Sequence, residues 1–161
     1  IADPRPPDHA AFLAADDASQ ADFDRLIRTI PADRWDAEAI TPGWTLRDHV
    51  GHLSDWMDEG LRALDVFAQG GHWPADPDEG VDAWNDRMVR GHRGSSMAET
   101  LARYDASRAA LRAAVLTLPM EDLRSPDGWS WIYDCLYGHT RKHLALVGPW
   151  CAAQAWPAAR A

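Results

Sequence analysis

The sequence is poor in lysine and cysteine and has no long apolar run. Lys142 is the only lysine, and 25 acidic residues outnumber 16 basic ones, giving a formal net charge of −9 and a pI near 5.1. Nucleic-acid binders normally carry a basic patch or stripe, and none is visible, so we expect no nucleic-acid partner. No segment approaches the roughly 20 consecutive apolar residues that a membrane span requires, so we expect no membrane partner either.

The few cysteines indicate a reducing environment. Cys135 and Cys151 fall in the same predicted helix, far enough apart in the sequence to be separated by about 24 Å along its axis, so they cannot form a disulfide there. Residues 1–7 have neither the basic start nor the apolar stretch of a signal peptide. These features predict free thiols and a cytoplasmic location.

No segment alternates as a β-strand does, whereas four segments show helical periodicity. In the first, Phe23, Ile27 and Ile30 follow the spacing of one helix face. Capping-box patterns starting at Thr45 and Ser96 mark the beginnings of the second and third. The chain, 46% hydrophobic, is long enough for one core. We therefore predict one domain, an all-α antiparallel four-helix bundle with a long connection between helices 2 and 3, spanning 1–161 with helices at about 8–30, 45–69, 96–118 and 130–148.

The connection between the second and third predicted helices is rich in glycine, proline and aspartate. It covers residues 70–94, with one or two helical turns expected around 81–89. Loops of this length within a compact domain are often functional, and this one could cover a pocket. The fourth helix is expected to follow a turn at residues 125–128 and to kink or end at Pro149.

The last predicted helix carries two histidines on its apolar face. His139 and His143 have i, i+4 spacing, which places two imidazoles side by side, as two ligands of one metal ion require. The alternative is a pair of hydrogen-bonded core histidines. That arrangement is costly, because four buried ring nitrogens would need partners. The pattern alone leaves both interpretations open.

A third ligand has to come from another helix. His52 is the strongest candidate, because it flanks the apolar face of the second helix beside Trp56. His49, one turn earlier, competes with it, although we interpret it as a boundary residue near the helix start. His72 and His92 lie in the long connection, where we expect them to be solvated.

Several neighbouring residues could modify such a site. Cys135 lies one turn before His139 and is either a thiolate ligand or, the favoured interpretation, a small core residue. Asp55, one turn after His52, could orient a ligand from behind, although a surface role is the simpler interpretation. Tryptophans could form the wall of an apolar pocket or belong to the core; those nearest the ligands are Trp44, Trp56, Trp129 and Trp131.

These motifs resemble those of a known family. Gly43-Trp44-Thr45, followed by His52-Leu53 and then by His139-x3-His143, is similar to the DinB-like superfamily, near the N-terminal domain group of mycothiol-dependent maleylpyruvate isomerases. The resemblance implies a four-helix bundle with a divalent metal, zinc or nickel, held by His52, His139 and His143. Some members carry Glu where this chain has His139, so the resemblance does not fix the metal.

The resemblance also implies an activity. Characterised members use the metal to activate a low-molecular-weight thiol, mycothiol or bacillithiol, for isomerisation or for S-transfer to a small electrophilic substrate. The sequence ends at Ala161, so we expect a stand-alone bundle without the C-terminal domain of the isomerases. Trp84-Asn85 resembles colibactin-resistance-type bundles, which share the fold but not the metal triad. The alternative function is therefore a non-enzymatic or metal-free bundle that acts as a ligand-binding or protective protein. The sequence also leaves open whether the protein forms a homodimer.

Overall fold

The computed structural model describes residues 5–38, 40–73 and 77–154, and this part of the chain is helical with no β-strand. The helices are α1 (His9–Thr29), the 3₁₀ turn η1 (Ala32–Arg34), α2 (Leu46–Ala68), α3 (Val81–His92), α4 (Met97–Thr117), α5 (Met120–Leu123), α6 (Pro126–Cys135) and α7 (Tyr137–Ala153). The predicted all-α bundle with a long connection between its second and third long helices is confirmed.

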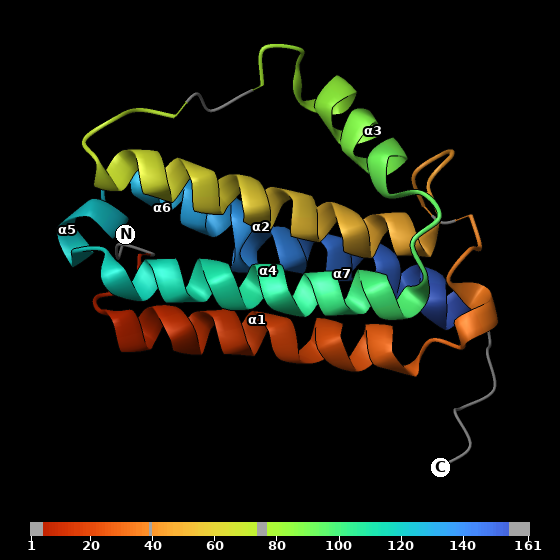
Figure 1. Ribbon diagram of the computed structural model, residues 1–161. Helices are drawn as coiled ribbons and strands as arrows, with labels where there is room; N and C mark the ends of the chain where they lie inside the picture. The colour runs from red at the N-terminus through yellow and green to blue at the C-terminus, as the bar shows by residue number, and fades with distance from the viewer. Residues whose placement is uncertain (1–4, 39, 74–76, 155–161) are drawn as a thin grey trace.

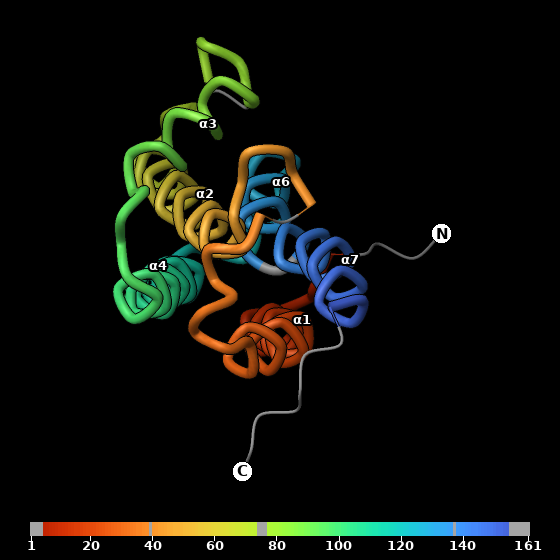
Figure 2. Tube along the Cα trace, turned by 90° about the vertical axis from the view of Figure 1, so that its right-hand side faces the viewer, coloured from red at the N-terminus to blue at the C-terminus, as the bar shows by residue number. Residues whose placement is uncertain are grey.

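Four columns of helix form the bundle, as the end-on view of Figure 2 shows. They are α1, α2, α4 and the pair α6 and α7. In Figure 1, α1 and the α6–α7 column run in one direction, while α2 and α4 run in the other. The neighbouring pairs α1 and α4, and α2 and α6, are thus antiparallel, whereas α2 and α4, and α1 and α7, pack side by side in the same direction. The long connection carries the chain back along the bundle, so α4 can start at the same end as α2.

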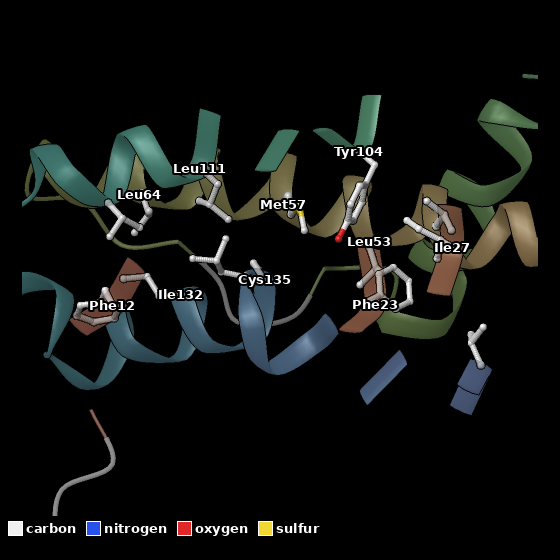
Figure 3. Packing of buried hydrophobic residues seen from close by; sticks show 14 of the residues in the cluster. Phe12, Phe23, Ile27, Leu53, Met57, Leu64, Tyr104, Leu111, Ile132 and Cys135 are labelled. Atoms are coloured by element: carbon white, nitrogen blue, oxygen red, sulfur yellow. The ribbon is translucent and has the colours of Figure 1, made fainter. Parts of the chain in front are cut away.

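The core lies where the apolar faces of the four columns meet (Figure 3). Phe23 and Ile27 from α1, Leu53 and Met57 from α2, and Leu111 from α4 are completely buried. Burying a side chain of this size contributes about 1.5–3 kcal/mol, so the stripes read from the sequence account for much of the driving force for bundle formation.

A polar link crosses this core and fixes the position of α7. Gln20 of α1 donates from Nε2 to Oγ1 of Thr140 at 2.8 Å, and the hydroxyl of Tyr104 in α4 donates to Oε1 of Gln20. All three side chains are almost fully buried. Because a buried polar group is costly without its partner, this link restricts how α7 can rotate against α1. It thereby also restricts His139, the residue before Thr140.

Both predicted capping boxes are present. The hydroxyl of Thr45 accepts from the amide of Asp48, whose carboxylate accepts from the amide of Thr45, and Ser96 and Glu99 pair in the same way. These bonds satisfy amides that have no partner within a helix, so the starts of α2 and α4 are determined locally.

The predicted fourth helix is wrong in its details, because it consists of two helices. α6 ends at Cys135, and Leu136 departs from helical geometry with φ −104° and ψ −95° before α7 begins. A Cβ on Gly138 would lie 2.5 Å from the carbonyl oxygen of Tyr133, so the chain folds back too closely here for any side chain. The break lets α6 pack on α2 while α7 packs mainly on α1.

The predicted limits of this column also need correction. The expected turn at 125–128 is the first turn of α6, where the Ser125 hydroxyl accepts from the amide of Gly128 and Pro126 takes the first helical position. Proline is suited to that position, because the amide it lacks would have no helical partner there. At the other end, α7 continues through Pro149 to Ala153, since one lost hydrogen bond close to the end does not stop a packed helix.

The long connection contains more helix than the sequence indicated. α3 covers Val81–His92 and lies along the outside of α2, as both views show. Trp84 and Val89 are its buried residues. The segment that was expected to cover a pocket is therefore in large part a helix packed on the bundle.

The expectations about the two cysteines and about membrane-spanning helices can be compared with the structure. Cys135 and Cys151 are both free, and burial raises the pKa of each thiol, to about 11 for Cys151. Within the described residues, no helix is both long enough and apolar enough to cross a membrane.

Gly60 on α2 is expected to be intolerant of a side chain. A Cβ there would lie 2.8 Å from Cβ and 3.1 Å from Sγ of Cys135 on α6. Gly60→Ala should therefore push α2 and α6 apart and lower the free energy of unfolding by about 1–3 kcal/mol. The melting temperature, followed by circular dichroism, should fall by several degrees.

Gly91→Ala is the matched control for that substitution. Gly91 also lies in a helix, but a Cβ there would meet nothing within 4 Å. Alanine is the better helix former, so the control should melt at or slightly above the wild-type temperature. Equal melting temperatures for the two variants would contradict the close approach of α2 to α6.

Candidate metal centre

Three imidazoles from two helices converge at one point inside the bundle. His52 comes from α2, and His139 and His143 come from successive turns of α7. Nε2 of His139 lies 3.1 Å from Nε2 of His52 and 3.2 Å from Nε2 of His143. One ring nitrogen from each of the three lies within 4.8 Å of the others. The i, i+4 spacing supplies two of these groups, and the break at Leu136 aims α7 so that they meet the third.

This arrangement fits a divalent metal ion. Two nitrogens bound to one tetrahedral zinc ion, each at 2.0–2.1 Å, lie about 3.3 Å apart. The two measured separations are close to that value. Neutral imidazoles that carry their hydrogen on Nδ1 present lone pairs at Nε2, and three converging lone pairs favour a cation among them. The histidine cluster can therefore hold a metal ion, and three protein ligands would leave a further coordination position for another molecule.

Burial keeps the three imidazoles uncharged. Desolvation lowers the pKa of His52 to about 2, with the neighbouring His139 and His49 adding to the shift. The pKa values of His139 and His143 lie well below the usual value for the same first reason, and each ring opposes protonation of its neighbours. All three rings are thus neutral near pH 7, which is the form that binds metals.

A fourth imidazole, His49, stands behind the cluster. It is not the boundary residue expected from the sequence, because it is fully buried and its Nδ1 lies 3.3 Å from Nδ1 of His143. That hydrogen bond turns the other nitrogen of His143 toward His52 and His139. Burial lowers the pKa of His49 to about 4, so it too is neutral. The i, i+3 spacing of His49 and His52, which places both on one side of a helix, was the signal in the sequence.

Three ring nitrogens around the cluster have no hydrogen-bond partner among the described residues. They are Nδ1 of His52, Nδ1 of His139 and Nε2 of His49, and all three are buried. Metal-binding histidines usually donate their second nitrogen to a carboxylate or a carbonyl. Of the candidate ligands, His143 alone has such support here, and another histidine provides it.

The cluster opens to the surface on two sides. The first opening, which we call the Lys142 hollow, has a volume of about 290 Å³. Its lining residues are His52, Trp56, Val81, Asn85, Ser130, Trp131, Asp134, His139 and Lys142. The second, which we call the acidic hollow, has a volume of about 410 Å³. Its lining residues are Thr41, Pro42, Trp44, His49, His52, Asp82, Asn85, Asp86, His143 and Leu146.

The candidate pocket tryptophans divide between these two hollows. Trp56 and Trp131 line the Lys142 hollow, where their ring centroids lie 6.4 Å apart. Trp44 lines the acidic hollow and packs edge-on against His52, with 5.0 Å between ring centroids. Trp129 packs against Phe12 of the core, with 6.0 Å between the ring centroids. Trp44, Trp56 and Trp131 therefore line the hollows, whereas Trp129 packs against the core.

Helix α3 separates the two hollows. Asn85 borders both of them, and its Oδ1 accepts from Nε1 of Trp56 at 2.9 Å. One residue further, Asp86 accepts from Nε1 of Trp44 at 3.3 Å. Trp84 packs on Trp56 with ring centroids 4.6 Å apart. No spacing in the sequence links Asn85 to the cluster, because only the tertiary structure brings α3 beside α2.

Asp55 and His92 hold the C-terminal end of α3 against α2. Asp55 is completely buried, and Nε2 of His92 lies 3.0 Å from its Oδ2, while Arg103 of α4 approaches its Oδ1 at 2.8 Å. His92 is thus not solvated, and its position depends on Gly51, where a Cβ would lie 2.5 Å from the ring. Within the described part of the chain, the partners of Asp55 are these two residues and not His52.

Two other sequence candidates lie away from the cluster. Cys135 is completely buried beside Gly60, and burial holds its pKa well above the usual value, so it is a neutral core thiol. It is not part of the group of potential ligands identified among the described residues. His72 is exposed at the surface, with Nδ1 3.4 Å from a carboxylate oxygen of Asp127.

The family model of the DinB superfamily matches residues 15–147, which covers every helix from the middle of α1 to the middle of α7. The chain belongs to the DinB superfamily. The match includes His52, His139 and His143, so the candidate metal centre lies within the part of the chain that defines membership.

The individual relatives support the fold but have no assigned activity. A crystal structure of an uncharacterised protein from Escherichia coli UTI89 superposes with a TM-score of 0.80 over 92% of this chain and 95% of that chain, at 13% identity. Uncharacterised proteins from two strains of Mycobacterium tuberculosis, CDC 1551 and H37Rv, are 41% identical over 58 residues, 36% of this chain. The matched segment spans only 20% of the length of each relative. This DinB superfamily chain therefore shares its bundle, and one short segment closely, with proteins of unassigned activity.

The convergence of the imidazoles predicts how substitutions change metal binding. His139→Ala or His143→Ala should abolish stoichiometric zinc binding, because two nitrogens do not replace a three-histidine site. His49→Ala should weaken zinc binding by roughly 10–100-fold, since it removes the bond that orients His143. Dialysed protein analysed for metal, together with calorimetric zinc titrations, gives the dissociation constants.

His72→Ala is the control, because this ring is exposed and lies outside the cluster. It should bind zinc as the wild type does. If zinc affinity falls equally in His49→Ala and His143→Ala, His49 is itself a ligand. If none of the variants changes the affinity, the cluster is not where zinc binds.

Proposed function

We propose that this DinB superfamily protein is a divalent-metal-dependent enzyme that transfers a low-molecular-weight thiol, such as mycothiol or bacillithiol, to a small electrophilic substrate. His52, His139 and His143 are the proposed metal ligands. One observation carries the proposal: three neutral imidazoles, two buried and one partly buried, meet where an aromatic-walled hollow of about 290 Å³ reaches them. A ligand site with an open position beside a pocket for an organic molecule is typical of catalytic rather than structural metal sites.

The chain's own residues have separate tasks in this proposal. The three imidazoles hold the cation, and their low pKa values keep them available as ligands near neutral pH. A divalent cation held there would supply the positive charge that stabilises a thiolate relative to a thiol. Trp56 and Trp131 exclude water from one side and offer apolar surface to the electrophile.

The transfer itself is a substitution at carbon. The thiol loses its S–H proton to solvent, and its sulfur lone pair forms a bond to the electrophilic carbon. The bond from that carbon to the leaving group breaks, and the leaving group departs with the bonding electrons. No further oxidant or reductant is needed, because thiol and electrophile give thioether, leaving-group anion and one proton. Orientation of the two reactants by the hollow walls then lowers the barrier.

Thiol transfer can be measured with a chromogenic electrophile. Zinc- or nickel-loaded protein, mixed with mycothiol or bacillithiol and 1-chloro-2,4-dinitrobenzene, should form the thioether and chloride in equal amounts. His143→Ala should lower the rate by at least about a hundredfold, because a metal ion typically contributes several kcal/mol to such a barrier. His72→Ala should react at the wild-type rate. Thioether formation no faster than without protein, with both thiols, would refute the proposal.

The second candidate is a bundle that binds a ligand without catalysing a reaction or needing a metal. It is favoured by the histidine–histidine contacts, which satisfy several ring nitrogens without an ion. It is also favoured by the Nδ1 atoms of His52 and His139, which have no supporting carboxylate among the described residues.

Thermal stability separates the two candidates. If the cluster binds zinc, an excess of about a hundredfold over the dissociation constant should raise the free energy of unfolding by about 2.7 kcal/mol. That corresponds to roughly 5–10 °C in melting temperature for a chain of this size. A chelator should reverse the shift, and His143→Ala should not show it. A wild-type melting temperature that neither zinc nor chelator changes would favour the metal-free bundle.

A further inference from the structure

The two hollows that reach the histidine cluster differ in charge, and this difference suggests separate occupants. We propose that the acidic hollow binds a thiol cosubstrate through a positively charged amine, while the Lys142 hollow receives the electrophile. The two substrates then approach the histidine cluster from opposite sides of Asn85. This inference rests on the proposed thiol transfer and specifies where each reactant binds. It selects a thiol with a free amine, such as bacillithiol, over mycothiol, whose cysteinyl amine is acetylated.

The geometry supports two entrances rather than one divided pocket. Both hollows are lined by His52 and Asn85, but the Lys142 hollow reaches His139 whereas the acidic hollow reaches His143. Asn85 is fixed between them by its hydrogen bond from Trp56. A ligand in one hollow therefore contacts the cluster without displacing a ligand from the other, as direct transfer between two bound reactants requires.

The acidic hollow carries uncompensated negative charge, whereas the Lys142 hollow does not. Asp82 and Asp86 line the acidic hollow from one face of α3, at i, i+4 spacing, and both are exposed. No lysine or arginine is among its lining residues. The Lys142 hollow also contains an acidic residue, Asp134, but Nζ of Lys142 lies 3.3 Å from its Oδ1, so these charges compensate each other.

A second observation in the acidic hollow points to a ligand. His49, which lines it, is completely buried, and its Nε2 has no hydrogen-bond partner among the described residues. A buried polar nitrogen without a partner is costly unless a bound molecule or water satisfies it. Trp44 adds an aromatic wall to the same hollow, and an ammonium group is attracted to the face of such a ring. Two carboxylates, an indole and a free imidazole nitrogen together suit an amine-bearing, polar cosubstrate.

The Lys142 hollow suits the other reactant. Its walls include Trp56 and Trp131, whose planes are inclined by 33° with centroids 6.4 Å apart. These surfaces favour a flat, apolar molecule. The acidic hollow offers a single tryptophan, Trp44, beside two carboxylates.

Two small thiols of similar length and opposite charge test this assignment. Zinc-loaded protein, with zinc content confirmed by elemental analysis, is titrated calorimetrically with cysteamine and with 3-mercaptopropionate. Cysteamine should bind more tightly by roughly three- to tenfold, the range expected for exposed charges. The double variant Asp82→Asn, Asp86→Asn should lose this preference. Asparagine at position 86 keeps an oxygen for the indole of Trp44, and circular dichroism confirms that the variant is folded.

Lys142→Gln and Trp131→Ala are the controls, because both residues line only the other hollow. Both should leave the cysteamine dissociation constant within about twofold of the wild type. Equal binding of the two thiols by the wild type, an undiminished preference in the double aspartate variant, or no binding of either thiol would overturn the assignment while leaving the metal centre intact. Absence of zinc from the loaded protein would instead refute the proposed function itself.

Discussion

The contact between four imidazoles of α2 and α7, three of them buried and His139 partly buried, is the constraint on which the rest of the site depends. His52 and His49 meet His139 and His143 at N–N distances of 3.1–3.3 Å inside the bundle. Uncharged rings are the form that tolerates such burial, and the lowered pKa values reflect this cost. The protein thus keeps a set of strong nitrogen ligands inside a bundle whose surface is acidic overall.

The break at Leu136 makes that contact geometrically available. A continuous helix would continue along α2 past Cys135, whereas the break turns α7 onto α1 and holds it there through Gln20 and Thr140. The histidine pair is then presented from the bundle interior instead of from its outer edge. The same column serves two purposes, because α6 supplies core packing through Cys135 while α7 supplies the candidate ligands.

Helix α3 converts this buried cluster into a site with distinct entrances. It is held at one end by the contact of His92 with Asp55 and nearer its start by Trp84 and Asn85 on Trp56. Without α3, His52 would face one broad opening. With it, the cluster is reached through two hollows that share Asn85 and differ in charge. Membership of the DinB superfamily gives the fold, but the arrangement of these walls is what suggests a reaction with two substrates.

The sequence by itself determined the bundle, both capping boxes and the helical spacing of His139 and His143, because these follow from local hydrogen bonding and a regular helix period. Tertiary structure decided the rest. The backbone break at Leu136 left no sequence signal beyond a single glycine, Gly138. The burial of His49 and His92, and the position of Asn85 between two hollows, depend on how α2, α3 and α7 pack against one another. Helix periodicity gives the face on which a residue lies, but only packing decides which other face it meets.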